Sequence, residues 1–492
     1  MNDILNVITT TLARVTYLDT VRGIALLFFL DWFFYLPFFR VAFSRTDENS
    51  GFKTRSNVKM LLLASVWLAA IVLLVNENSA LRAVGATVLF GIFRRHYINE
   101  RWHRVRRGFG APGFMSHWAI LYIFVIEITR LIDATGALTH LSFQTLKWDF
   151  GWIMICAGSY KILSGYVRSD GMEYGQANPM WGYFWRFFAK QPPTSPISQA
   201  QNWLACVVEF SCGILMVIPN ATTQVIGAIG ISLSFLYVAI FIRLGRLAIL
   251  MFFLPLFFLP SVEASFTTGT LAIVQAPEAV VFAISGVLWI FMAILPIIKV
   301  MQYVNLFLNK KFPAPIQNAL GFVAGRLPII MWRVFTPDVT NFFVRVYSCD
   351  ASGNQIEALI DEKRYGLTDW KRFKFKLRAL HVTESIALTS VFTTLRYFPS
   401  DRKMFEDKLW KYGRSLAADW GTHCPIMRFE FVAIMKAPKC FNFVNVGIFD
   451  LELETGNVTE TKYVTDYSYA APSRYSPVRE SAIPGTYLPK SP

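Results

Sequence analysis

Charged residues are scarce in this chain of 492 residues, and the familiar catalytic and metal-binding motifs are absent from its sequence. Only 16% of the residues are charged, against roughly a quarter in soluble domains. Hydrophobic residues make up 54%, and the mean hydropathy is +0.39. The sequence contains no CxxC pair, no P-loop, no HExxH motif and no Ser-His-Asp order. These absences exclude the commonest hydrolase, metal and nucleotide sites.

Cysteine is also sparse, and the basic residues outnumber the acidic ones. The six cysteines are Cys156, Cys206, Cys212, Cys349, Cys424 and Cys440. The first three fall in apolar blocks, so we expect buried thiols there. A disulfide among the last three is left as an open alternative.

The net charge of +15 comes from Lys and Arg in short loops between apolar blocks, and no nucleic-acid-binding motif accompanies them. Membrane lipids, not nucleic acids, are the expected partners.

Long apolar runs fill the chain up to about residue 300. A membrane-spanning helix needs about 20 mostly apolar residues. Nine candidate spans are Gly23–Phe43, Lys59–Val75, Leu81–Phe93, Ser116–Ile132, Asp149–Leu163, Trp203–Ile218, Thr223–Ile242, Leu247–Val262 and Val280–Ile298. We therefore predict an all-α membrane bundle of about nine helices over residues 23–300. An interfacial segment over 1–22 precedes it, and a juxtamembrane linker over 301–335 follows.

The C-terminal part has the composition of a soluble domain. Polar and apolar residues alternate in Asn341–Ser348, Arg372–Leu380 and Met427–Met435, which predicts strands, and Arg402–Ala418 has helical spacing. We predict a smaller, β-rich α+β domain over 336–460. The tail over 461–492 is rich in Ser, Pro, Tyr and Thr, and we expect it to be extended or disordered, or ordered by a protein partner that binds residues 336–492.

The distribution of Lys and Arg predicts the orientation. The three basic loops, Arg40–Lys59, Arg94–Arg107 and the pair Arg243 and Arg246, fall on one side of a nine-span bundle. The positive-inside rule places them in the cytoplasm. The C-terminal domain would then be cytoplasmic as well, and one span more or fewer would reverse that assignment.

Several ionisable residues lie inside the predicted spans, where a charge costs about 2.5–3.5 kcal/mol on insertion scales. Lys161 and Glu209 are the candidate catalytic residues, because a lysine in a dry site can act as a base or as a Schiff-base amine. The residues expected to line a polar pocket are Asp31, Glu127, Arg130, Tyr160 and Tyr166. The alternative is a set of ion pairs that fix helix packing, and Glu127 and Arg130 have the helical spacing for such a pair.

Two connecting segments have unusual compositions. Arg101, Arg104, Arg106 and Arg107 lie in a basic loop that could hold anionic lipid headgroups, although a plain positive-inside loop has the same composition. Ser159–Trp185 is rich in Gly and aromatic residues, so we expect it to fold back against the bundle as an aromatic belt or a pocket lid. The sequence predicts no metal site.

The residues around Lys161 resemble a known family. Ala157–Tyr166 reads AGSYKILSGY, an apolar run followed by a lysine and Gly-Tyr, and the next span carries Glu209 and Gly213. Trp332–Pro337 is similar to a turn that follows the last span of that family. The pattern resembles the HTTM (horizontally transferred transmembrane) group, which includes vitamin K-dependent gamma-glutamyl carboxylase. The resemblance implies that Lys161 takes the place of the family's lysine base.

The resemblance covers about Arg94–Asp338, and this sequence differs from the family enzymes in two respects. The family enzymes have a histidine in a later span where Leu236–Gly245 has none. The family enzyme also places its C-terminal domain outside the cytoplasm, opposite to the assignment from basic loops. We therefore expect a bundle with a pocket for a quinone, a lipid or a similar amphiphile, with glutamate carboxylation disfavoured. A non-catalytic accessory subunit and a transporter are the alternatives.

Overall fold

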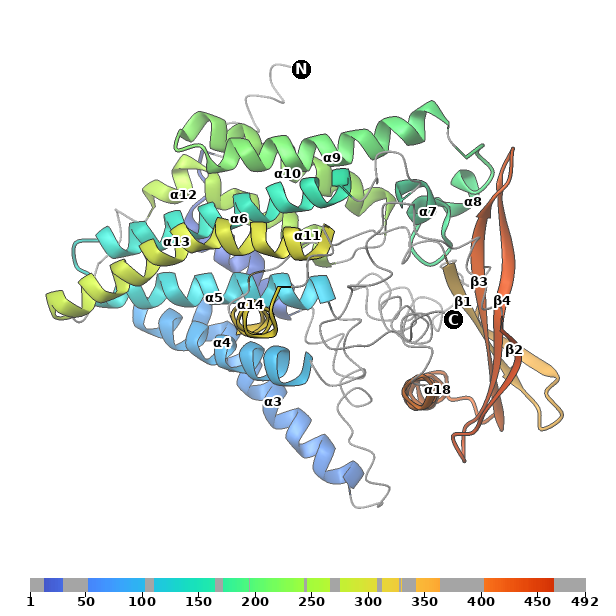
Figure 1. Ribbon diagram of the computed structural model, residues 1–492. Coiled ribbons are helices and arrows are strands. Elements are labelled where there is room, and N and C mark those ends of the chain that lie inside the picture. Colours follow the sequence, from blue (N-terminus) through green and yellow to red (C-terminus); the bar gives the residue numbers. More distant parts are fainter. Residues whose placement is uncertain are drawn as a thin grey trace.

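The computed structural model describes residues 13–29, 52–101, 110–163, 171–193, 195–242, 246–265, 275–307, 312–326, 329, 342–362 and 402–463. It combines a bundle of long helices with a C-terminal antiparallel sheet at one end of the bundle (Figure 1). The predicted combination of a helical bundle and a smaller, β-rich α+β domain is therefore observed.

The helices of the bundle begin with residues 17–29. Those that follow are α3 (Phe52–Leu74), α4 (Ser79–Arg101), α5 (Gly110–Ile132), α6 (Ala137–Leu163), α9 (Pro196–Val217), α10 (Ala221–Phe241), α11 (Arg246–Phe253), α12 (Pro260–Ala264), α13 (Glu278–Phe307) and α14 (Ala314–Arg326). Two short helices, α7 (Gly171–Ala177) and α8 (Trp185–Phe188), lie between α6 and α9 in the chain.

Four of the described helices are long and apolar enough to cross a membrane, fewer than the nine spans expected. They are the segments Met115–Ile132 in α5, Gln199–Val217 in α9, Ala221–Phe241, which is α10, and Glu278–Val304 in α13. Many large apolar side chains on these helices point outward, such as Phe282 of α13 with 81% exposure. Exposed apolar side chains in this number are unfavourable in water and suit lipid.

The predicted spans differ in their bounds from the helices observed, and two of these differences have a clear cause. Leu247–Val262 is not one straight helix, because Pro255 and Pro260 divide it into α11, the 3-10 helix η3 (Leu254–Phe258) and α12. The span predicted to begin at Asp149 begins at Ala137 instead, since its first three turns carry buried polar residues that lower the hydropathy. The first predicted span is described only up to residue 29.

Glycines bring neighbouring helices of the bundle into close contact. At Gly213 of α9, a Cβ atom would lie 2.5 Å from the backbone nitrogen of Ile155 in α6. At Gly158 of α6, a Cβ atom would lie 2.6 Å from Cβ of Phe210. Small residues at helix crossings are the usual means of tight packing in membranes, where lipid removes much of the hydrophobic driving force. The α6–α9 contact is therefore set by backbone against backbone.

The C-terminal sheet has the strand order β2-β1-β3-β4-β5, and all neighbouring strands are antiparallel. Its strands are β1 (Phe342–Cys349), β2 (Gln355–Ile360), β3 (Ile426–Lys436), β4 (Phe441–Glu452) and β5 (Val458–Tyr463). Helix α18 (Arg402–Trp420) packs on the sheet through Phe405 and Tyr412, whose rings contact Phe431 and Phe429. The strands predicted at Asn341–Ser348 and Met427–Met435 correspond to β1 and β3. The one predicted at Arg372–Leu380 lies outside the described residues.

The segment that contains α7 and α8 connects the sheet to the bundle (Figure 1). Asn178 donates a hydrogen bond of 2.7 Å to the carbonyl oxygen of Phe342 in β1, and the backbone N–H of Phe441 in β4 donates to Ala189 at 2.9 Å. On its other side, the backbone N–H of Tyr183 donates to Phe241 at the end of α10. The aromatic segment Ser159–Trp185 was expected to fold against the bundle. Residues 159–163 of this segment end α6, and its other described part, residues 171–185, contacts both the bundle and the sheet.

Candidate functional site

Lys161 and Glu209, the two candidate catalytic residues, lie in direct contact. Lys161 is in the last turn of α6 and Glu209 is in the middle of α9. The lysine Nζ lies 2.6 Å from Oε1 of the glutamate, and each side chain is only 6% exposed. The close approach of α6 and α9 at Gly158 and Gly213 brings the two residues together. This charge-assisted hydrogen bond stabilises an ammonium beside a carboxylate inside the bundle.

In the Lys161–Glu209 pair, one carboxylate oxygen accepts no hydrogen bond from the described residues. Oε2 of Glu209 is buried and has no hydrogen-bond donor among the residues that the structure describes. A buried acceptor without a donor costs roughly 1–3 kcal/mol. A hydroxyl group brought by a ligand would satisfy it. Tyr160, a predicted pocket residue next to Lys161, is buried in α6.

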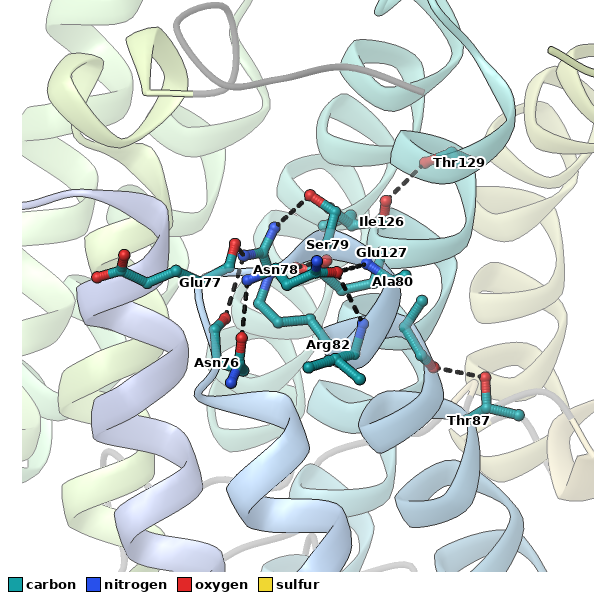
Figure 2. Close-up of polar contacts among 12 residues, drawn as sticks. Asn76, Glu77, Asn78, Ser79, Ala80, Arg82, Thr87, Ile126, Glu127 and Thr129 are labelled. Carbon is teal, nitrogen blue, oxygen red and sulfur yellow. Dashed lines mark hydrogen bonds and ion pairs between the residues drawn. The ribbon is translucent and has the colours of Figure 1, made fainter. Parts of the chain in front are cut away.

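Glu127 of α5 has a cationic partner that the sequence had not indicated. Its Oε2 accepts a hydrogen bond of 3.0 Å from Nε of Arg82 in α4, and both side chains are buried (Figure 2). The other two nitrogens of the guanidinium are also used. Nη1 donates to the carbonyl oxygens of Asn76 and Glu77, and Nη2 donates to the hydroxyl of Ser79. Arg82 therefore fixes the α3–α4 connection to α5.

The predicted neighbour of Glu127, Arg130, contributes to the same polar cluster. Its charge stabilises the Glu127 carboxylate, and its guanidinium lies 5.7 Å from the centroid of the Tyr17 ring in the N-terminal helix. The cluster thus includes side chains of three helices. Every nitrogen of Arg82 is already bonded, so this residue joins α4 and the α3–α4 connection to α5.

A third buried pair joins α6 to α13. Nζ of Lys299 lies 3.7 Å from Oδ1 of Asp149, and both side chains are almost completely buried. The other oxygen of Asp149, Oδ2, accepts hydrogen bonds from the indole of Trp118 at 2.7 Å and from the hydroxyl of Tyr122 at 2.9 Å. Asp149 therefore connects α5, α6 and α13, although the sequence had indicated it only as the start of a span.

Pro296 explains a second contact between α6 and α13. A proline has no N–H, so the carbonyl oxygen of Met292, four residues earlier, cannot form its helical hydrogen bond. The indole N–H of Trp148 in α6 donates to this oxygen at 3.0 Å. One turn after Lys299, the hydroxyl of Tyr303 donates to the carbonyl oxygen of Cys156. Few residues of α13 are buried, so these polar contacts hold it against the bundle.

Replacing Trp148 by phenylalanine removes the donor to Met292 and keeps most of the aromatic surface. We expect the free energy of unfolding to fall by about 0.6–1.7 kcal/mol, between the average and the largest values for hydrogen bonds between membrane helices. Thermal unfolding of the full chain in nanodiscs measures this change. Trp152→Phe is the matched control, because its indole nitrogen has no partner among the described residues. Equal losses in both variants would show that the bond to Met292 contributes nothing.

A partly exposed cluster lies at the start of α6. His140, Gln144 and Lys147, which share one helix face, all contact Glu263 of α12 at distances of 2.7–2.9 Å. Burial works to raise the pKa of Glu263, but the hydrogen bonds and positive charges of Lys147 and His140 outweigh it and hold the pKa below its ordinary value. Glu263 therefore stays ionised, and its contacts attach α12 to α6.

Several predicted residues cannot be placed. Asp31, Tyr166, Arg104, Arg106 and Arg107 lie outside the described residues. Arg101 ends α4, and its side chain is also outside the described part. Within the described chain, no three His, Cys, Asp or Glu side chains gather as a metal site would require, and all six cysteines are free.

The residues that the sequence did not single out share one property. Arg82, Lys147, Asp149 and Lys299 lie near the ends of apolar blocks, where a charge is ordinary and reaches water easily. An ion pair inside the bundle needs a partner for each charge, and counting acidic and basic residues near each span would have indicated candidates. Only the packing of the helices shows which ones meet.

No protein-family model matches the chain, and neither a curated protein nor a solved structure is similar to it. The resemblance to the HTTM group therefore stays a prediction that depends on the residues around Lys161 and Glu209.

Proposed function

We propose that the chain is a multi-pass membrane protein that binds a quinone, a lipid or a similar amphiphile beside Lys161 and Glu209. The buried Oε2 of Glu209, which has no donor among the described residues, is the observation that carries this proposal. A ligand with a hydroxyl or carbonyl head group has the groups that this pair needs. Its apolar part would lie along the lipid-facing surface of the bundle.

The pair provides a proton donor and a proton acceptor side by side. The Lys161 ammonium can donate to a carbonyl oxygen of the ligand, and the Glu209 carboxylate can accept from a hydroxyl. Because the carboxylate stabilises the charged lysine, Lys161 acts as a base only after Glu209 or a ligand has taken up its proton. In this proposal Lys161 corresponds to the lysine base of the HTTM-like enzymes.

The architecture proposed with this site is the nine-span bundle with a cytoplasmic C-terminal domain. The sheet contacts α8, and the segment just before α8 contacts the end of α10, directly ahead of the basic residues Arg243 and Arg246. The positive-inside rule assigns that end of the bundle to the cytoplasm. These contacts place the sheet at that end of the bundle whatever the number of spans.

Glu209→Gln tests the ligand site. The amide keeps one oxygen for Lys161 and turns an NH2 group toward the position of Oε2, so it cannot accept the ligand's hydroxyl. Removing a charged hydrogen bond costs about 1.5–3 kcal/mol, which corresponds to roughly 10- to 100-fold weaker binding. The measurement is the rise in melting temperature of the purified protein when a short-chain quinol or a monoacylglycerol is titrated.

Glu263→Gln is the control, since it changes another lysine-bound glutamate that is far from Lys161 in the chain. We expect it to keep the ligand-induced rise, and Lys161→Met to lose it together with Glu209→Gln. If wild type and all three variants respond equally to each probe, the amphiphile site beside Lys161 is wrong.

An accessory role for the C-terminal domain is the second candidate. Strands β2 and β5 are the edges of the sheet, and no further strand pairs with either within the described residues. An edge strand can bind an extended segment of a partner protein. In that case the variants at Lys161 and Glu209 would leave the function of the protein unchanged, whereas changes in β2 or β5 would abolish partner binding.

A further inference from the structure

Helix α8 presents aromatic and basic side chains together on the surface of the protein. Phe184, which precedes the helix, is 51% exposed, and Phe187 is 61% exposed. Arg186 and Lys190 are exposed beside them. The Arg186 guanidinium lies 5.5 Å from the centroid of the Trp185 ring, a cation–π contact that holds it near the aromatic residues. Aromatic rings with flanking cations are typical of the membrane–water interface.

The aromatic side chains of α8 continue the lipid-facing surface of α10. Outward-facing residues of α10, such as Leu236 and Ile240, lead along the helix to Phe241. The Phe241 ring lies 5.7 Å from the ring of Phe184 and 6.1 Å from that of Phe188. The apolar surface that meets the lipid chains therefore extends without a break from α10 to α8.

The same helix contacts the C-terminal sheet on its other side. The Trp185 ring lies 6.0 Å from the ring of Phe443 in β4, and the carbonyl oxygen of Ala189 accepts the N–H of Phe441. Figure 1 shows α8 between the end of the bundle and the sheet. A force that fixes α8 at the membrane surface would thus fix the sheet there too.

We propose that α8 is an interfacial anchor that inserts Phe184 and Phe187 into the headgroup region and binds anionic phospholipids through Arg186 and Lys190. The end of α10 that contacts this segment is the one marked as cytoplasmic by Arg243 and Arg246, and the cytoplasmic leaflet is the anionic one. Charge complementarity therefore selects a lipid partner. The inference does not require an amphiphile at Lys161.

The depth of Phe187 in the bilayer is the first test. A nitroxide is attached at Phe187→Cys in full-length protein with Cys440→Ser, since Cys440 alone among the six cysteines is not fully buried. Lys403→Cys on α18, an exposed position of the soluble domain, is the matched control. In nanodiscs we expect position 187 to collide more often with oxygen than with a water-soluble nickel chelate, and position 403 to show the reverse. Equal access of the chelate to both positions would overturn the proposal.

Lipid selectivity is the second test. Spin-labelled phosphatidylserine and phosphatidylcholine are compared as boundary lipids of the wild type and of Arg186→Glu with Lys190→Glu. A cation near an anionic surface contributes about 1 kcal/mol, so we expect the preference for phosphatidylserine to fall at least roughly fivefold for each cation replaced. Lys403→Glu with Arg414→Glu is the control with the same charge change. An equal loss in both double variants would overturn the assignment to α8.

Discussion

Replacing Arg82 by leucine is expected to lower the free energy of unfolding by about 3–5 kcal/mol, the largest effect that the structure predicts. The change leaves the Glu127 carboxylate buried at 0% side-chain exposure without the cation that bonds it at 3.0 Å. It also removes the donors to the carbonyl oxygens of Asn76 and Glu77, which join α3 to α4. Unfolding by heat or by denaturing detergent, followed by helical circular dichroism, measures the loss.

The double variant Arg82→Leu with Glu127→Leu separates the two contributions. It also removes the buried carboxylate that has lost its bonded cation, so we expect it to recover most of the stability, while the contacts to the loop carbonyls stay lost. Arg22→Leu is the control for removal of an arginine in a surface ion pair. Its partner Glu77 lies 3.5 Å away and is largely exposed, so its loss should cost less than about 1 kcal/mol. If the double variant is less stable than Arg82→Leu, the buried charge is not the cause.

Gly213→Ala is expected to lower the free energy of unfolding by about 1–3 kcal/mol. The new Cβ would lie 2.5 Å from the backbone nitrogen of Ile155 and 3.0 Å from the carbonyl oxygen of Gly151. Backbone atoms cannot rotate away, so α6 and α9 must separate. The gain of about 0.5–1 kcal/mol from alanine in a helix is smaller than this penalty. The distance between Lys161 and Glu209 should grow as well, because the same helices carry them.

Gly286→Ala in α13 provides the comparison, since nothing lies within 4 Å of the Cβ that it adds. We expect this variant to be as stable as the wild type or more stable by up to about 1 kcal/mol. Melting temperatures of both variants in the same nanodiscs give the comparison. A loss of the same size at both positions would mean that helix contact at Gly213 is not the reason.

Much of the architecture follows from local patterns in the sequence. Apolar runs of about 20 residues predict helices such as α5, α9, α10 and α13, since a helix of that length crosses the bilayer and satisfies its backbone hydrogen bonds internally. Alternation of polar and apolar residues predicts β1 and β3 in the same way. The ends of the spans follow less directly from the sequence, because prolines divide one apolar run and buried polar residues lower the hydropathy at the start of α6.

The chemistry of the site was determined in part by the sequence. Lys161, Glu209 and Glu127 stand out by themselves, since a charge in an apolar run requires a partner. Which residue becomes the partner depends on how the helices cross. Glycines at Gly158 and Gly213 bring Lys161 to Glu209, whereas Arg82 reaches Glu127 from 45 positions away. The spacing of residues in the sequence predicts which side chains are neighbours within one helix. Contacts between helices depend on tertiary packing.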